Sequence, residues 1–184
     1  MQKRRLANET QMIRLATPSD CSNLAVLSAQ VWLDTYAKEG VKRQYSEFVL
    51  SNFTVEYFQQ LVSHTDFRLW LCEQGDVLQG FVLVNLKSHC QCDRYTAGYD
   101  QVAVSDVSYE VEKLYVSSRH QGQGIGKRLL AVMEQELARP YWLYTWVEND
   151  ANSFYRHLDF ALVGQLAFEF SGHSIHNHVY VKHP

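Results

Sequence analysis

The sequence predicts an α/β (α+β) domain built on a mixed β-sheet. Strand-like and helix-like segments alternate along most of the chain, and two strand-like segments close it. Segments that alternate in this way pack as layers, with helices against the faces of the sheet. The length of 184 residues suits one domain, which we expect to cover residues 1–184, because no internal repeat and no Pro- or Ser-rich linker divides the chain.

Local signals place the elements of the first half of the chain. Residues 12–16 (MIRLA) alternate as a strand does. Thr17, Pro18 and Asp20 follow as a capping box, which predicts the start of a helix. The other expected elements are a helix over residues 54–62 and a hairpin of strands 67–73 and 78–86 around the turn QGD.

The second half of the chain is expected to contain a long loop, two helices and four strands. Residues 87–106 are polar and irregular, which predicts the loop. Asn149 precedes the second helix as its expected cap. In order, the other segments are a strand over 108–116, a helix over 123–138, a strand over 141–147, a helix over 149–158, and strands over 162–170 and 174–182.

Composition limits the class of protein. Hydrophobic residues make up 46% of the chain, enough for a packed core. The formal net charge of −3 argues against a nucleic-acid partner, which needs a basic face. No apolar run approaches the roughly 20 residues that span a membrane, and the basic start lacks the apolar stretch of a secretory signal. The four scattered cysteines do not form a disulfide framework, so we expect a cytoplasmic, reducing setting.

The glycine-rich stretch at residues 118–130 (SRHQGQGIGKRLL) indicates a function. Gly122, Gly124 and Gly126 lie between an expected strand and an expected helix. Such a turn can bind phosphate, because the amides at a helix N-terminus have no partner within the helix and glycines let the backbone approach the ligand. A P-loop and a dinucleotide-binding turn both require other glycine spacings. A flexible turn without a ligand is the alternative.

The spacing Gln121-x-x-Gly124-x-Gly126 resembles the acetyl-CoA loop of the GNAT superfamily of N-acetyltransferases. Residues 151–160 (ANSFYRHLDF) resemble a later segment of that family, A-x-x-F-Y-x-x-x-G-F, and a strand separates the two motifs. The resemblance is close over residues 108–160. It implies the GNAT fold, with a central mixed, mostly antiparallel sheet of about seven strands flanked by helices. It also implies that acetyl-CoA is the co-substrate.

A narrower likeness connects both ends of the chain with one branch of this family. Residues 31–61 and 162–184 resemble the spermidine/spermine acetyltransferases typified by PaiA. This likeness implies that the protein acetylates the primary amine of a small polyamine-like molecule. Acetylation of a protein N-terminus or lysine, and a non-catalytic coenzyme A-binding sensor module, remain alternatives. Homodimers are common in the family, and exposed aromatics in the last strands would permit one here.

The resemblance also implies which residues contact the coenzyme. The strand end at residues 114–116 would pair with the pantetheine arm, and a bulge there would direct the Val116 amide at the oxyanion of the reaction. The amides of the loop and helix start would hold the pyrophosphate. The complete expected set is Leu114, Tyr115, Val116, Gln121, Gly122, Gln123, Gly124, Ile125, Gly126, Lys127, Asn149 and Tyr155.

Acetyl transfer to an amine needs a base and an acid. An amine with a pKa near ~10 is protonated at neutral pH and must lose a proton before it attacks, while the leaving thiolate must gain one. The resemblance assigns Tyr155 as the general acid and Glu110 as the base, with Glu112 as a rival on the same face of the strand. A core aromatic is the alternative for Tyr155, and a solvated or ion-paired residue is the alternative for either glutamate. No cysteine stands near the motifs, so we expect direct attack in a ternary complex.

The sequence departs from the family pattern at two positions. Glu148 stands where an asparagine is common and Asn149 follows it, which leaves the coenzyme contact of this turn open. Asp159 replaces the glycine before Phe160, and an aspartate tolerates the left-handed conformation that this turn needs.

Two groups of possible metal ligands have ordinary explanations, and we predict no metal site. The histidines within residues 173–183 alternate with apolar residues as in any half-exposed strand. The stretch HCQC at residues 89–92 lacks the second pair of ligands that zinc takes. Candidate contacts for a cationic amine are Asp34, Tyr36 and Glu39 on the first helix, which otherwise form a solvated helix face.

Overall fold

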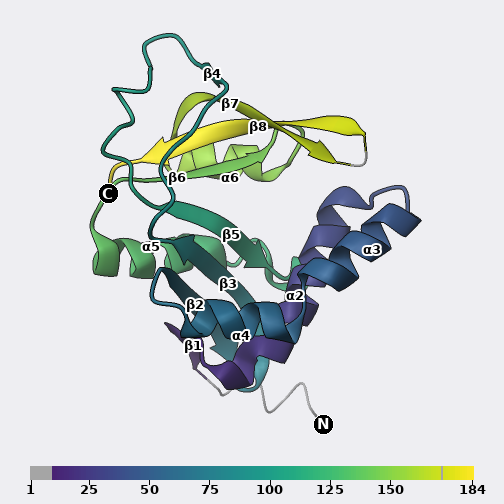
Figure 1. Cartoon of the computed structure of the whole chain (residues 1–184). Helices are drawn as coiled ribbons and strands as arrows, with labels where there is room; N and C mark the ends of the chain where they lie inside the picture. The colour runs from purple at the N-terminus through teal and green to yellow at the C-terminus, as the bar shows by residue number, and fades with distance from the viewer. Residues whose placement is uncertain (1–9, 171) are drawn as a thin grey trace. The chain divides into compact units, whose positions relative to one another are not determined.

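A computed structural model of the protein describes residues 10–170 and 172–184 (Figure 1). Over these residues the strands form one mixed, mostly antiparallel sheet of eight strands, in the order β1-β2-β3-β5-β6-β8-β7-β4, with helices flanking it. This confirms the predicted fold class. The basic start at residues 1–9, to which the prediction on a secretory signal applies, lies outside the described residues.

The chain divides into two compact units. One comprises the described chain up to Leu83 together with Lys113–Gln135, and the other comprises Val84–Glu112 and Glu136–Pro184. Three of the described elements contribute to both units, because the boundaries fall after Leu83, Glu112 and Gln135: β3 (Val77–Asn85), β5 (Glu110–Val116) and α5 (Ile125–Leu137). The single domain expected over residues 1–184 stays a prediction.

The first unit confirms the predicted hairpin and adds a helix that the sequence did not indicate. Gly75 in the hairpin turn adopts φ +63°. The additional helix, α3, begins after Lys42 without a side-chain cap and buries only Val49, so it lacks the signals of a helix start. The elements are β1 (Gln11–Leu15), the 3-10 turn η1 (Pro18–Asp20), α2 (Cys21–Tyr36), α3 (Arg43–Asn52), α4 (Val55–Ser63), β2 (Phe67–Gln74), β3 (Val77–Asn85), the 3-10 turn η2 (Ser118–His120) and α5 (Ile125–Leu137).

Helices cover both faces of the strands in this unit. Helices α2 and α4 pack on one face of these strands (Figure 1). Helix α5 lies on the other face, since a Cβ built on Gly80 of β3 would lie 3.3 Å from Ile125 Cγ2. The core between α2, α4 and the strands consists of Cys21, Leu24, Ala25, Leu27, Phe58, Leu61, Leu69, Leu71, Phe81 and Leu83.

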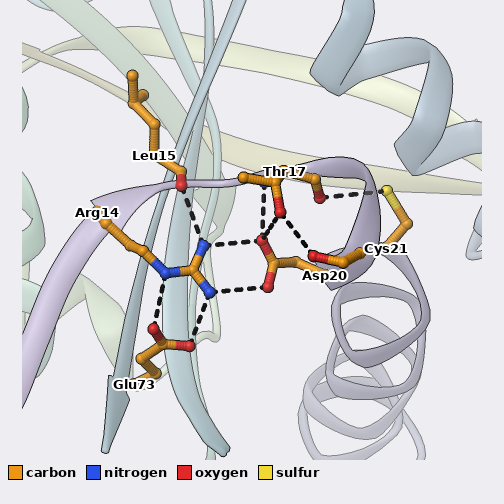
Figure 2. Close-up of polar contacts among 7 residues, drawn as sticks. Arg14, Leu15, Thr17, Asp20, Cys21 and Glu73 are labelled. Carbon is orange, nitrogen blue, oxygen red and sulfur yellow. Dashed lines mark hydrogen bonds and ion pairs between the residues drawn. The ribbon is translucent and has the colours of Figure 1, made fainter.

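An ion network joins β1, β2 and the start of α2 (Figure 2). The Arg14 guanidinium donates to the Asp20 carboxylate at 2.8 and 2.9 Å and to the Glu73 carboxylate at 2.7 and 2.9 Å. Asp20 also accepts from the Thr17 amide at 2.7 Å, which confirms the predicted capping box, here at the turn η1 that leads into α2. The hydrogen bonds from Arg14 lower the pKa of Asp20 to about 2. The sequence did not indicate the parts played by Arg14 and Glu73.

Among its described residues, the second unit contains four strands that pair in an antiparallel manner, and β5 adds to them as a parallel neighbour of β6. Strand β5 pairs with β6 at Glu110 and Trp142. The other pairs, β6 with β8, β8 with β7 and β7 with β4, are antiparallel. The elements are β4 (Arg94–Tyr95), β6 (Tyr141–Trp146), α6 (Ala151–His157), β7 (Ala161–Phe170) and β8 (His173–Lys182).

The segment over residues 87–106 is less irregular than predicted. Asp93 N–H donates to Gln165 O and Thr96 N–H donates to Val163 O, both at 2.9 Å, so that the two-residue strand β4 forms against β7. This short strand raises the number of strands above the seven or so expected. Apolar residues of the segment pack on the sheet in a cluster of Cys90, Val104, Val107, Trp142, Val163, Leu166, Val179 and Val181.

The cap predicted for the second of the later helices is wrong by one residue. Asp150 precedes α6 and makes no side-chain cap bond. The Asn149 side chain instead accepts from the Ala151 amide at 2.9 Å. The left-handed conformation expected at Asp159 is confirmed, with φ +60°.

Candidate active site

The glycine loop before α5 has an open, left-handed backbone. Gly122 and Gly124 adopt φ +76° and +74°, a region that residues with a Cβ rarely enter. A Cβ built on either glycine would meet no atom of the described residues within 4 Å. The loop therefore leaves room for a ligand at the two positions where only glycine is unstrained.

The first amides of α5 lack an acceptor within the helix. The first bond of helical type runs from Arg128 N–H to Gly124 O at 3.1 Å. The N–H groups of residues 125–127 precede it, at the end of the helix where the dipole favours an anion. Together with the open glycine loop, these donors fit the pyrophosphate that the sequence predicts here.

Gln121 holds the loop against the end of β5. The Gln121 Nε2 donates to Val116 O at 3.3 Å. The next residue, Ser117, is in turn bonded to β3, because its N–H donates to Gln79 O at 2.9 Å. The glutamine of the predicted coenzyme loop thus has a structural role within the described protein. Its side chain connects the loop with the end of the strand that is expected to pair with the pantetheine arm.

The Ile125 side chain is buried, and the half-buried Tyr115 side chain packs against the core. The Tyr115 ring lies 5.5 Å from the Phe81 ring, centroid to centroid, and Ile125 is buried. A contact of Ile125 with a coenzyme would therefore come from its backbone. Sequence reasoning missed Gly80, where a Cβ would lie 2.8 Å from Tyr115 O, although a glycine inside a strand is a signal of close backbone approach.

Glu110 and Glu112 lie in the second unit and accept hydrogen bonds from the segment after β3 and from the last residue of β3, respectively. Ser88 Oγ donates to Glu110 at 2.6 Å, and Asn85 Nδ2 donates to Glu112 at 3.0 Å. Glu110 is buried, whereas Glu112 is half-buried.

Tyr155 is packed among aromatic rings. It is 8% exposed, and its ring centroid lies 5.3 Å from that of Phe160 and 5.8 Å from that of Tyr180. This packing agrees with the alternative of a core aromatic. Asn149 uses its side-chain oxygen in the turn before α6. The roles expected for both residues therefore stay predictions.

The candidate metal ligands make structural contacts. Within residues 10–170 and 172–184, no three His, Cys, Asp or Glu side chains are grouped so as to hold a metal ion. His178 Nδ1 lies 3.0 Å from Asn152 Oδ1. Cys90 is buried, and burial raises the pKa of its thiol to about 12.

Two aromatic side chains of the second unit face solvent. Tyr144 of β6 and Phe168 of β7 expose 38% and 46% of their surface, and their ring centroids lie 5.0 Å apart. The homodimer that exposed aromatics would permit stays a prediction.

Of the helices described by the structure, none combines the length and the apolar character needed to cross a bilayer.

Strand β5 of the mixed sheet leads through the glycine loop into α5, in agreement with the fold that the sequence motifs imply. Residues 65–162, more than half of the chain, match the model of the acetyltransferase (GNAT) domain. The chain therefore belongs to the GNAT acetyltransferase family.

Solved structures with the same fold cover nearly the whole chain. PaiA N-acetyltransferase from Thermoplasma acidophilum, solved with coenzyme A, matches with a TM-score of 0.67 at 16% identity, over 95% of this chain and 99% of that one. Arabidopsis thaliana NAA60, solved with acetyl-CoA, matches with a TM-score of 0.64 at 18% identity, over 95% and 100%. Spermidine N-acetyltransferase SpeG from Vibrio cholerae matches with a TM-score of 0.61 at 18% identity, over 94% and 92%. At these identities the likeness establishes the fold.

Proposed function

We propose that the protein transfers an acetyl group from acetyl-CoA to the primary amine of a small polyamine-like molecule. The observation that carries this proposal is the open left-handed backbone at Gly122 and Gly124, directly before the first amides of α5. A Cβ built on either glycine would meet no atom of the described residues within 4 Å. A phosphorylated ligand that approaches the backbone would account for both the conformation and the open space.

Bound acetyl-CoA would supply an acetyl group activated as a thioester. In this proposal the amides of residues 122–127 hold the pyrophosphate, and the backbone of residues 114–116 holds the pantetheine arm. The Val116 amide donates a hydrogen bond to the carbonyl oxygen, where negative charge develops. Gln121 supports this arrangement through its bond to Val116 O.

Glu110 accepts the proton of the amine in this proposal, directly or through water, and Glu112 is its rival. Glu110→Gln is expected to lower kcat/KM by about a hundredfold and to remove the acidic limb of the pH profile, because it removes the base. Glu112→Gln is expected to have a much smaller effect on both. Steady-state kinetics across pH measures the two variants, and the reverse order of effects would assign the base to Glu112.

Tyr155 donates the proton to the leaving thiolate. Tyr155→Phe keeps the ring packing and removes only the hydroxyl, so we expect kcat to fall by about a hundredfold while coenzyme A affinity is retained. Tyr99→Phe removes a hydroxyl from an exposed tyrosine of the long loop and serves as the control. A protein that binds coenzyme A but turns over no acceptor would support the alternative of a sensor module.

Two observations support a small cationic acceptor. One of the solved structures with the same fold is a spermidine N-acetyltransferase. Asp34 lies near the end of α2 and Glu39 just beyond it, and both are exposed. Tyr36 lies between them in the sequence, and its ring centroid is 4.8 Å from that of Trp32. Acidic and aromatic groups attract an ammonium group.

A screen of acetyl-CoA consumption over polyamines, amino acids, aminoglycosides and short peptides tests the acceptor. We expect turnover with spermidine or spermine to exceed turnover with the other classes. Turnover confined to peptides would replace the polyamine with a protein acceptor. The homodimer and the cytoplasmic location belong to the same proposal, and light scattering of the purified protein tests the homodimer.

A further inference from the structure

A buried asparagine in α6 forms hydrogen bonds with the backbone of the preceding turn. Asn152 is 5% exposed and stands three residues before Tyr155. Its Nδ2 donates to Trp146 O at 2.9 Å, to Val147 O at 3.2 Å and to Asn149 O at 2.7 Å. These carbonyls belong to the end of β6 and to the turn that leads into α6.

The carbonyl oxygen of the same side chain is bonded to β8. The Tyr180 hydroxyl donates to Asn152 Oδ1 at 3.0 Å in a buried position. His178 Nδ1 lies 3.0 Å from the same oxygen, and it must carry a proton because an amide oxygen can only accept. The three carbonyls around Nδ2 fix the orientation of the amide. Asn152 therefore connects the end of β6, the start of α6 and strand β8.

Few residue types satisfy this site. An aspartate would direct a second acceptor at three carbonyl oxygens, and an apolar residue would leave buried donors and acceptors without partners. A serine is too short to reach both sides. The family segment A-x-x-F-Y leaves this position open, so the requirement comes from the fold of this chain.

Helix α6 depends on such an anchor. It has seven residues, and its preceding residue Asp150 makes no side-chain cap bond. A helix this short is not stable on its own in water. The bonds of Asn152 therefore determine where α6 begins relative to β8.

We propose that Asn152 is a positioning residue for Tyr155. This inference rests on the proposed function, in which Tyr155 is the general acid. Tyr155 lies about one helical turn after Asn152, and its ring packs at 5.8 Å against Tyr180, the residue whose hydroxyl bonds to Asn152. Asn152 thus fixes both the helix that carries Tyr155 and the ring against which Tyr155 packs.

Asn152→Ser and Asn177→Ser form a matched pair for the test. Asn177 is 4% exposed, but its Nδ2 bonds to Ile175 O of its own strand. We expect Asn152→Ser to lower kcat by about ten- to a hundredfold, to leave KM for acetyl-CoA within about twofold, and to shift the alkaline limb of the kcat–pH profile. Asn177→Ser should leave kcat and the profile unchanged. A folded Asn152→Ser protein with the kcat and pH profile of the unmodified protein would overturn the inference.

Tyr180→Phe provides a second variant if Asn152→Ser does not fold. It removes one donor to Asn152 Oδ1 and keeps the ring beside Tyr155. We expect a smaller fall in kcat and the same direction of shift in the pH profile. An unchanged kcat with an unchanged profile would again overturn the inference.

Amide hydrogen exchange separates this inference from the proposed function. Exchange over residues 146–155 should accelerate in Asn152→Ser and not in Asn177→Ser, whether or not the protein is active. Turnover in the unmodified protein with no change in exchange or kcat in Asn152→Ser would overturn the inference alone. Accelerated exchange without any acetyl-CoA turnover in the unmodified protein would overturn the proposed function and support the anchoring by Asn152.

Discussion

Single glycines determine how closely the backbone segments of each unit approach. Gly80 in β3 lies against the backbone of β5, and Gly164 in β7 lies against residues 92–94. The glycines of the loop, Gly122 and Gly124, could be found from the sequence because their spacing is local. The neighbours of Gly80 and Gly164 could not be found in this way, because they come from segments that are distant along the chain.

Gly80→Ala is expected to destabilise the protein by about 1–3 kcal/mol, because the new Cβ would lie 2.8 Å from Tyr115 O and the strand cannot move without loss of its hydrogen bonds. Urea unfolding measures the change. The same substitution should weaken coenzyme A binding, since residues 114–116 are expected to hold the pantetheine arm. Unchanged stability would show that β3 and β5 approach less closely than described.

Gly164→Ala is expected to expose the two thiols of the long loop. Its Cβ would lie 2.6 Å from Cys92 Sγ and 2.5 Å from Arg94 O, so β4 would have to move away from β7. Burial raises the pKa of both Cys90 and Cys92, and we therefore expect slow labelling by a thiol reagent in the unmodified protein. Mass spectrometry should detect faster labelling of both in the variant. Cys21, buried in the other unit, is the internal control, and equal rates at Cys90 and Cys92 in the two proteins would contradict the expectation.

At the scale of elements, periodicity predicted the helices and strands that bury a regular face. Helix α3 was missed because it has no cap and buries a single residue, Val49. Strand β4 was missed because two residues form too short a pattern, and only the pairing with β7 reveals it. The helix start at α2 was predicted from its capping box, whereas the ion network around it joins residues far apart in sequence (Figure 2).

The network at the start of α2 should make stability depend on pH in the acid range. The folded protein holds the pKa of Asp20 at about 2, below its ordinary value of 3.8, so ionised Asp20 stabilises the fold above pH 3.8. This stabilisation, about 2 kcal/mol at most, is lost as the pH falls through 3.8 toward 2.

Thermal unfolding between pH 5 and pH 2 measures this contribution. Arg14→Gln removes the donor and should lower the melting temperature at pH 5 by several degrees. Because the variant has lost the bonded guanidinium already, its stability should fall less than that of the unmodified protein as the pH decreases. Parallel curves for the two proteins would show that Asp20 does not depend on Arg14.

At the scale of the whole molecule, the order of elements and the family could be predicted, because the two motifs and the strand between them are continuous in sequence. The acceptor could not be predicted in the same way. Contacts between side chains of separate elements, such as the stacking of Trp32 of α2 on Phe48 of α3 at 4.9 Å, do not show in the order of residues along the chain. The role of Asn152 was also hidden, because its partners come from β6, the turn after it and β8.

Calorimetry with coenzyme A tests the central claim that the glycine loop and the start of α5 bind the coenzyme's pyrophosphate. Gly124→Val and Gly98→Val are compared with the unmodified protein. Both glycines have positive φ, +74° and +91°, and a Cβ on either would meet no described atom within 4 Å, so backbone strain is similar in the two variants. We predict that the unmodified protein and Gly98→Val bind coenzyme A with similar affinity, whereas Gly124→Val binds at least about tenfold more weakly. Absence of binding to the unmodified protein, or equal affinity in Gly124→Val, would contradict the account.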